Sequence, residues 1–72
     1  MVISGIIKGV IFQNEDNGYT VLVIDNDGAE TTCVGTLPSV NIGETLELTG
    51  EYTTNKNYGE QFKFSHAKVL QP

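Results

Sequence analysis

Residues 19–34 read YTVLVIDNDGAETTCV, two runs of strand-forming residues on either side of a turn. The first run is Tyr19 to Ile24 and the second is Glu30 to Val34, both rich in the β-branched and aromatic residues that favour strands. The Asp25 to Gly28 segment between them has the composition of a tight turn. The sequence therefore predicts a β-hairpin at this point.

The segments on either side of this hairpin extend the β pattern to the whole chain. Ile3 to Phe12 is a long first strand that contains glycines, which often mark a bulge or sharp curvature. Asn14 to Gly18 ends in Asn-Gly, a strong turn signal because both residues tolerate positive φ. The residues between 35 and 43 have no period, and we expect a crossing loop there with one helical turn near Pro38.

Two further strands complete the pattern. Thr45 to Thr53 alternates strictly between apolar and polar residues, as expected of a strand with one solvated face. Glu60 to Leu70 is the last strand, and Asn55 to Gly59 is the loop before it. The apolar positions change parity after His66, which predicts a bulge or bend.

The order of these elements predicts an all-β fold, a five-stranded OB-like barrel. A long curved first strand, a hairpin, a crossing and two more strands follow the order of the oligonucleotide/oligosaccharide-binding (OB) barrel. An SH3-like barrel is the main alternative at this length. The irregular insertion between the third and fourth strands favours the OB fold.

Size and composition limit what the chain can be. A length of 72 residues corresponds to one domain with a small core. The single Cys33 excludes an internal disulfide and fits a reducing compartment. The chain has neither a charged-then-apolar leader nor an apolar run of about 20 residues, so we expect a soluble, cytoplasmic protein with no membrane partner.

The charge balance bears on the type of ligand. The chain has four lysines, no arginine and nine acidic residues, for a net charge of -5. Nucleic acids are held by Lys and Arg that displace counterions from phosphates. We therefore expect no tight nucleic-acid binding by bulk electrostatics, and any contact would need a local patch or a neighbouring domain.

No catalytic residue, metal site or bound cofactor is predicted for this chain. A phosphate-binding loop that ends in Gly-Lys-Ser/Thr is absent. Cys33 and His66 are the one conceivable nucleophile-base pair, and a mid-strand cysteine more often serves as a small buried residue. Asp25 to Gly28 resembles the opening of a calcium loop but lacks that loop's glycine and glutamate positions, so a hairpin turn explains it.

Binding candidates remain on the strands and loops that OB barrels use for single strands. Exposed aromatic rings can stack on bases while lysines follow the phosphates. The candidates for nucleic-acid binding or docking are Tyr19, Lys56, Tyr58 and Lys63. Phe62 and Phe64 are possible stacking platforms, but we expect both in the core because they share one face of the last strand.

Four stretches also carry a family resemblance: FQNEDNGYTVL at residues 12–22, VGTLP at 34–38, GETLELTGEY at 43–52 and YGEQFK at 58–63. In order and spacing they resemble the opening segment of the RecD-like ATP-dependent DNA helicases, the long stand-alone relatives of the exodeoxyribonuclease V alpha subunit. Together they span nearly the whole chain, and the four taken jointly are more specific than any one alone.

The resemblance implies a role in DNA recombination and repair. In that family the segment is an N-terminal OB-like accessory domain, followed by helix-hairpin-helix modules and two superfamily 1 motor domains that move 5′ to 3′ on DNA. Residues 1–72 would then be one accessory domain excised from a larger helicase. ATP and Mg would belong to the motor domains. The implied partners are the other domains of the helicase and, weakly, single-stranded DNA.

The resemblance also implies a structural signature. Its residues are Asn17, Gly18 and Tyr19 in the first turn, Gly43, Gly50 and Tyr52 around the fourth strand, and Tyr58, Gly59, Gln61 and Phe62 in the last hairpin. Two alternative functions stay open: a free-standing module that binds single-stranded nucleic acid, and a protein-interaction module that pairs through an exposed strand edge.

Overall fold

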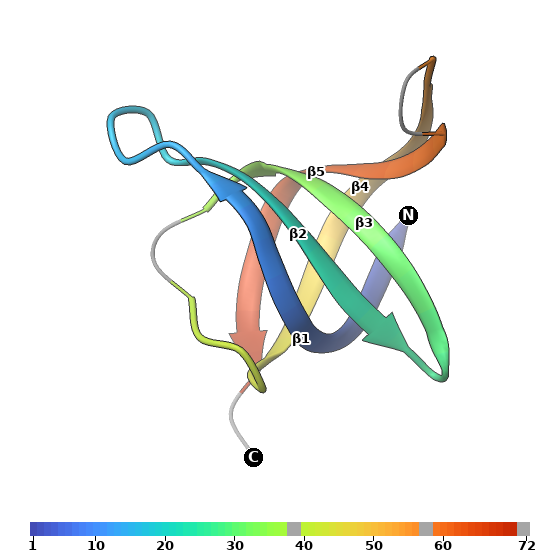
Figure 1. The fold of residues 1–72 in the computed structure, drawn as a ribbon. Coiled ribbons are helices and arrows are strands. Elements are labelled where there is room, and N and C mark those ends of the chain that lie inside the picture. Colours follow the sequence, from blue (N-terminus) through green and yellow to red (C-terminus); the bar gives the residue numbers. More distant parts are fainter. Residues whose placement is uncertain (38–39, 57–58, 71–72) are drawn as a thin grey trace.

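The computed structural model describes residues 1–37, 40–56 and 59–70. Over these ranges the chain forms five β-strands (Figure 1). They are β1 (Val2–Gln13), β2 (Tyr19–Asn26), β3 (Ala29–Thr36), β4 (Thr45–Asn55) and β5 (Gly59–Leu70). Each strand was predicted, and each is one to three residues longer than its sequence pattern indicated. The predicted helical turn near Pro38 falls on residues outside the described ranges.

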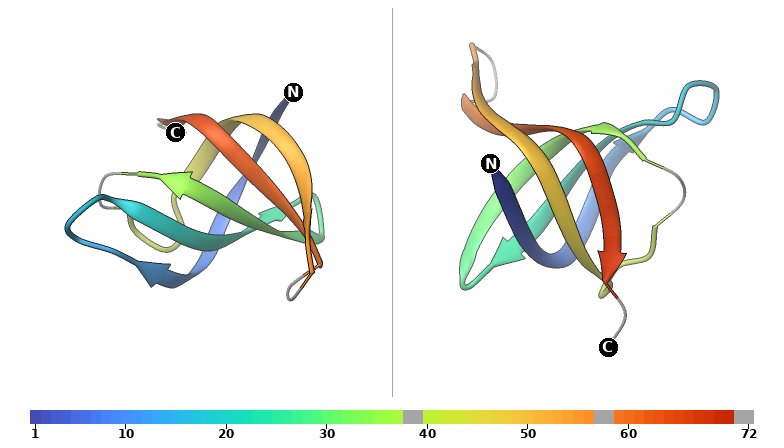
Figure 2. Two further views of the ribbon diagram at one scale, coloured as in Figure 1. Left: turned by 90° about the horizontal axis from the view of Figure 1, so that it is seen from above. Right: turned by 180° about the vertical axis from the view of Figure 1, so that it is seen from behind.

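The strands close into a barrel in the order β1-β2-β3-β5-β4. All neighbours are antiparallel except β3 and β5, which run parallel and join through Cys33↔Phe62 and Val34↔Lys63. This closure is visible when the barrel is seen from above and from behind (Figure 2). The prediction of an all-β, five-stranded OB-like barrel is confirmed.

β1 takes part in both sides of the barrel. Its first half pairs with β4 and its second half with β2. The β1–β2 register shifts between Ile7 and Gly9 and again between Val10 and Phe12, so two β-bulges bend the strand. The predicted bulge near a glycine is confirmed at Gly9.

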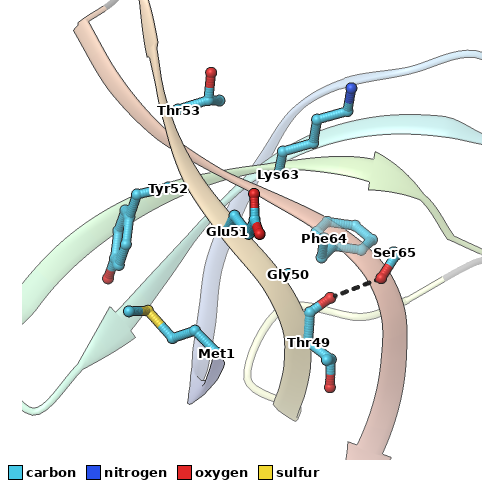
Figure 3. A pocket seen from close by; sticks show the side chains of 9 residues that line it. All are labelled: Met1, Thr49, Gly50, Glu51, Tyr52, Thr53, Lys63, Phe64 and Ser65. Atoms are coloured by element: carbon cyan, nitrogen blue, oxygen red, sulfur yellow. Dashed lines mark hydrogen bonds between the residues drawn. The ribbon is translucent and has the colours of Figure 1, made fainter.

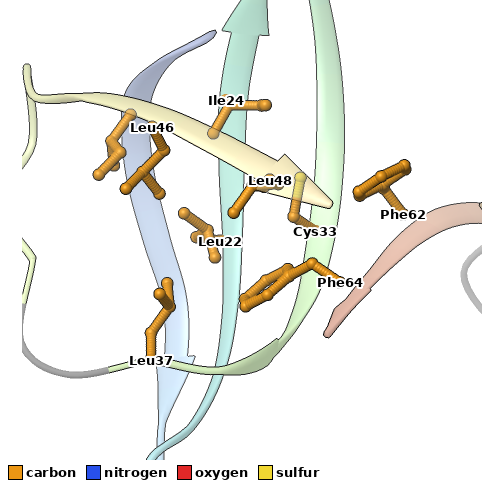
Figure 4. Close-up of a cluster of buried hydrophobic side chains, with 9 residues drawn as sticks. Leu22, Ile24, Cys33, Leu37, Leu46, Leu48, Phe62 and Phe64 are labelled. Carbon is orange, nitrogen blue, oxygen red and sulfur yellow. The ribbon is translucent and has the colours of Figure 1, made fainter. Parts of the chain in front are cut away.

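A small hydrophobic core fills the barrel (Figure 4). Its fully enclosed side chains include Leu22, Ile24 and Phe62, with Phe64 beside them. The prediction that Phe62 and Phe64 belong to the core is confirmed. Cys33 is also enclosed, and burial raises the pKa of its thiol from 9.0 to about 12, so the thiol stays neutral near neutral pH.

Two hairpin turns depend on backbone conformations that favour particular residues. Between β2 and β3, Asp27 (φ 57°) and Gly28 (φ 91°) both adopt the left-handed conformation, as type I′ turns require. The Gly28 N–H donates to Asp25 Oδ1 at 2.8 Å. The turn predicted at Asn17-Gly18 is present; Gly18 has φ 77°, while Asn17 does not adopt the left-handed conformation that it tolerates.

Asn17 serves the β1–β2 loop through its side chain instead. Its Oδ1 accepts a hydrogen bond from the backbone N–H of Tyr19 at 2.9 Å. The Asn14 N–H donates to Tyr19 O, and the Gly18 N–H donates to Asn14 O, both at 2.8 Å. Because these bonds close a loop of several residues, one left-handed residue is enough to reverse the chain direction.

The β4–β5 hairpin carries the bulge that the parity change predicted. Thr49 pairs with His66, and Gly50 pairs with Phe64, so Ser65 is the extra residue. The bulge therefore lies one residue before His66. On one side of the bulge, β4 pairs with β1 through Thr45 to Thr49; on the other side, β5 pairs with β3 through Phe62 and Lys63.

Candidate functional site

The outer wall of the barrel holds a continuous row of cross-strand neighbours. Phe12 pairs with Val21, Val21 with Val34, Val34 with Lys63, and Lys63 with Glu51. Side chains on a strand alternate between its two faces, and the core residues Leu22, Cys33 and Phe62 occupy the alternate positions. The row therefore crosses the wall on its outer side, from an apolar end at Phe12 to a charged end at Glu51.

A hollow of about 540 Å³ lies at the apolar end of this row. We call it the β2–β3 hollow; its lining residues are Ile11, Phe12, Tyr19, Val21, Thr32, Val34 and Gln61. They come from β1, β2, β3 and β5, so four strands build it. The β1–β2 loop and the β4–β5 hairpin rise at the same end of the barrel, opposite the β2–β3 turn (Figure 1).

The bulge in β1 explains why the hollow has an apolar rim. Because the register shifts between Val10 and Phe12, the extra residue Ile11 breaks the alternation. Ile11 and Phe12 are consequently both on the surface, 64% and 51% exposed. Tyr19, 41% exposed, joins them at the start of β2, held by the hydrogen bonds of the β1–β2 loop.

The floor of the hollow is uncharged. Val34 is only 6% exposed, yet it lies outside the core cluster and lines the hollow. The polar groups of the lining are the Tyr19 hydroxyl, Thr32 and the 8%-exposed Gln61. Such a surface can bury apolar side chains or stack on a flat ring, but it offers no cation for a phosphate.

A second hollow, of about 560 Å³, lies at the charged end of the row (Figure 3). Lys63 and Glu51 are cross-strand partners there, with the bulge residue Ser65 nearby. Ser65 Oγ donates to Thr49 O at 3.3 Å. Because Lys63 and Glu51 are opposite charges on neighbouring strands, the lining has no net positive charge from this pair, and the hollow is a poor phosphate site.

The structure separates the binding candidates that the sequence indicated. Tyr19 lines the β2–β3 hollow, whereas Lys63 lines the second hollow. Lys56 is exposed in the turn after β4, and Tyr58 lies outside the described residues. Phe62 and Phe64 are buried, so neither ring is available for stacking on a base.

Sequence reasoning missed most of the β2–β3 hollow. Ile11, Phe12, Val21 and Val34 were predicted only as strand residues, and of the lining residues Tyr19 alone was a binding candidate. The available signal was three consecutive apolar residues, Val10 to Phe12, at the end of a strand and before a polar turn. In a regular strand one of two consecutive residues faces the core, whereas at a bulge both residues can be exposed.

The residues of the family signature take structural positions. Tyr52 packs edge-on against Phe62, with ring centroids 5.1 Å apart and an interplanar angle of 77°. Gly43 precedes β4 and Gly59 begins β5. The N–H of Leu37 donates to Gly18 O at 2.9 Å, which ties the crossing loop to the first turn. Tyr19 and Gln61 are signature residues that also line the β2–β3 hollow.

Cys33 and His66, the pair considered as a nucleophile and base, lie apart in their surroundings. Cys33 is fully enclosed in the core, while His66 is exposed on β5, so the two do not form a nucleophile-base pair. Within residues 1–37, 40–56 and 59–70, no group of three or more His, Cys, Asp or Glu side chains could hold a metal ion. The same residues contain no helix long and apolar enough to cross a membrane.

Comparison with known proteins adds one match. A family model described as the OB-fold domain of the ATP-dependent DNA helicase YrrC matches residues 1–72, the whole length of the chain. A search of curated proteins found no match.

Proposed function

This chain belongs to the family of OB-fold domains of the ATP-dependent DNA helicase YrrC, and on that basis we propose that it is the non-catalytic accessory domain of a RecD-like DNA helicase. In this proposal the parent enzyme moves 5′ to 3′ on DNA and acts in recombination and repair in the cytoplasm. ATP and Mg bind to its motor domains. The present domain docks on the rest of the enzyme.

The observation that carries the docking role is the β2–β3 hollow. It joins exposed apolar residues, among them Ile11 and Phe12, to an uncharged floor around Val34. Contiguous exposed apolar surface with a polar surround is typical of protein interaction sites. The absence of a cation from the lining argues against a site for phosphate groups.

Comparing the parent protein with and without residues 1–72 tests this proposal. We expect the isolated domain to have no ATPase activity, and the truncated parent to keep DNA-stimulated ATP hydrolysis while unwinding duplexes less well. The intact parent should unwind duplexes with a 5′ single-stranded tail and leave those with a 3′ tail paired. Loss of ATP hydrolysis on truncation of a correctly folded parent, or unwinding of the 3′-tailed substrate, would contradict the proposal.

A second candidate function, guidance of single-stranded DNA, rests on the exposed rings of Phe12 and Tyr19. They lie at the surface that OB barrels use for single strands, and aromatic rings of this kind can stack on bases. Fluorescence anisotropy of a labelled single-stranded oligonucleotide, titrated with the domain at low and moderate salt, tests it. Binding that fades with salt and is lost in the double variant Phe12→Ala, Tyr19→Ala would support guidance, whereas constant anisotropy would exclude it.

A further inference from the structure

Acidic residues lie at both ends of the wall that contains the β2–β3 hollow. At one end, Asp25 of β2 pairs directly with Glu30 of β3, two like charges side by side. At the other end, Glu15 and Asp16 are exposed in the β1–β2 loop that leads into Tyr19. The apolar lining of the hollow is thus placed between two acidic clusters.

Lysines neutralise little of this charge. The ion pair found in the described ranges joins Lys8 Nζ to Asp25 Oδ2 at 3.8 Å, with half of the lysine side chain exposed. Lys63 neighbours Val34 on the wall, but it also pairs across the strands with Glu51. Like charges opposite one another in a sheet are unfavourable. A cation supplied by a partner would therefore stabilise the Asp25–Glu30 end of the wall.

From this distribution we propose that the outer face of β2 and β3 docks a basic, apolar protein segment. Hydrophobic side chains of the segment fill the β2–β3 hollow, and its Lys or Arg residues face Glu30 at one end and Glu15 and Asp16 at the other. The inference rests on the docking role in the proposed function and specifies the chemistry of the docked partner.

Charge complementarity decides between this occupant and two others. A DNA strand would bring phosphates toward the acids at both ends of the hollow and would find no cation in its lining. A second copy of the chain would bring the same acidic clusters and a net charge of -5. The acidic clusters that repel a DNA strand and a second copy of the chain attract a basic partner.

The test uses three synthetic peptides of equal length and alternating composition: Leu-Lys, Leu-Glu and Ser-Lys. Each is titrated into the isotope-labelled 72-residue chain while backbone amide NMR shifts are recorded. We expect the Leu-Lys peptide to shift amides around Tyr19, Val21 and Thr32. The other two peptides should bind at least about tenfold more weakly, because each lacks one of the two required features.

Matched variants separate the proposed face from general attraction to an acidic protein. Phe12→Ser should weaken Leu-Lys binding by about tenfold, whereas Ile42→Ser, which removes a similarly exposed apolar residue from the loop before β4, should leave it unchanged. Glu30→Gln should weaken binding several-fold and make it less sensitive to salt. Glu47→Gln, on β4 away from this face, should have no effect.

Several results would overturn the inference: no binding of any peptide, equal binding of the Leu-Glu peptide, shifts centred outside β2 and β3, or equal weakening by the control variants. Tighter binding of an oligothymidylate to the same amides would assign the face to DNA instead. None of these results depends on helicase activity. If one of these results were obtained and the parent enzyme still needed residues 1–72 for unwinding, the proposed accessory function would stand. Only the docking face on β2 and β3 would be rejected.

Discussion

The α-carbon of Gly50 lies directly against the backbone carbonyl of Lys63 on the neighbouring strand. A Cβ atom at position 50 would overlap the Lys63 carbonyl oxygen and lie 2.6 Å from the Cα of Phe64. This close approach occurs at the β4–β5 bulge, where Ser65 is the extra residue. Gly50 is therefore required by the packing of two backbones at the point where the ladder shifts by one residue.

Gly50→Ala should destabilise the domain. The added methyl group meets backbone atoms, which cannot rotate away as a flexible side chain could, so the bulge must shift. We expect the free energy of unfolding to fall by about 2 kcal/mol or more. Urea unfolding followed by circular dichroism measures this. Gly9→Ala is the matched control, because a Cβ there meets nothing within 4 Å; an equal loss in both variants would contradict the explanation.

Gly28→Ala should destabilise the domain for a different reason. A Cβ at position 28 has open space around it, but the residue has φ 91°. Left-handed backbone costs a non-glycine L-residue about 1 kcal/mol, so we expect a loss of that size in the same unfolding experiment. Replacement by D-alanine, which favours positive φ, should restore stability. A D-alanine variant no more stable than Gly28→Ala would rule out the backbone as the cause.

Phe62→Ala should cost far more stability than Phe12→Ala. Phe62 is fully enclosed and packs against Tyr52, whereas half of Phe12 is exposed. Truncation of a buried Phe typically costs about 3–5 kcal/mol, which is comparable to the whole stability of a small domain. We expect Phe62→Ala to be largely unfolded by near-ultraviolet circular dichroism and Phe12→Ala to stay folded. Similar melting temperatures for the two variants would contradict the assignment of Phe62 to the core.

The buried thiol of Cys33 predicts a loss of stability at alkaline pH. The pKa of the thiol is 9.0 in the unfolded chain and about 12 in the folded barrel, because burial disfavours the thiolate. Above pH 9.0 the unfolded chain releases a proton that the folded chain keeps. The contribution of this group to the free energy of unfolding therefore falls as pH rises from 9.0 toward about 12, by at most about 1.4 kcal/mol per pH unit.

Comparison with Cys33→Ala isolates this effect from the titration of lysines and tyrosines. The variant loses some packing at every pH, but the difference in unfolding free energy between wild type and variant should shrink as pH rises above 9.0. Chemical denaturation at a series of alkaline pH values measures that difference. A constant difference would show that the Cys33 thiol ionises with the same pKa in both states.

Local sequence patterns were sufficient to predict most of the fold. The β-branched runs on either side of Asp25 to Gly28 predicted the β2–β3 hairpin, and the parity change near His66 predicted the bulge now found at Ser65. The Asn17-Gly18 turn was also predicted, although not how its two residues share the work: Gly18 is left-handed and Asn17 accepts a hydrogen bond through its side chain. An Asn-Gly pair can supply two left-handed residues or one such residue and a side-chain acceptor, and the length of the loop decides which is used.

The candidate site was less predictable from the sequence. Tyr19 was chosen as an exposed aromatic residue, and it lines the β2–β3 hollow. Lys63, chosen for its charge, lies in a different hollow beside Glu51. Phe12 was predicted only as the end of the first strand, because neither the position of a bulge nor the residue opposite it can be read from one strand alone.

The sequence by itself determined the number and order of the strands, the burial of Phe62 and Phe64 and the net negative charge, because alternation and turn chemistry act between residues close along the chain. Only the tertiary structure decided which surface is available for binding. The β2–β3 hollow combines residues of β1, β2, β3 and β5, and their alignment depends on barrel closure and on the bulge at Ile11. Those are contacts between distant segments, so the hollow and the acids at its two ends exist only once the barrel has closed.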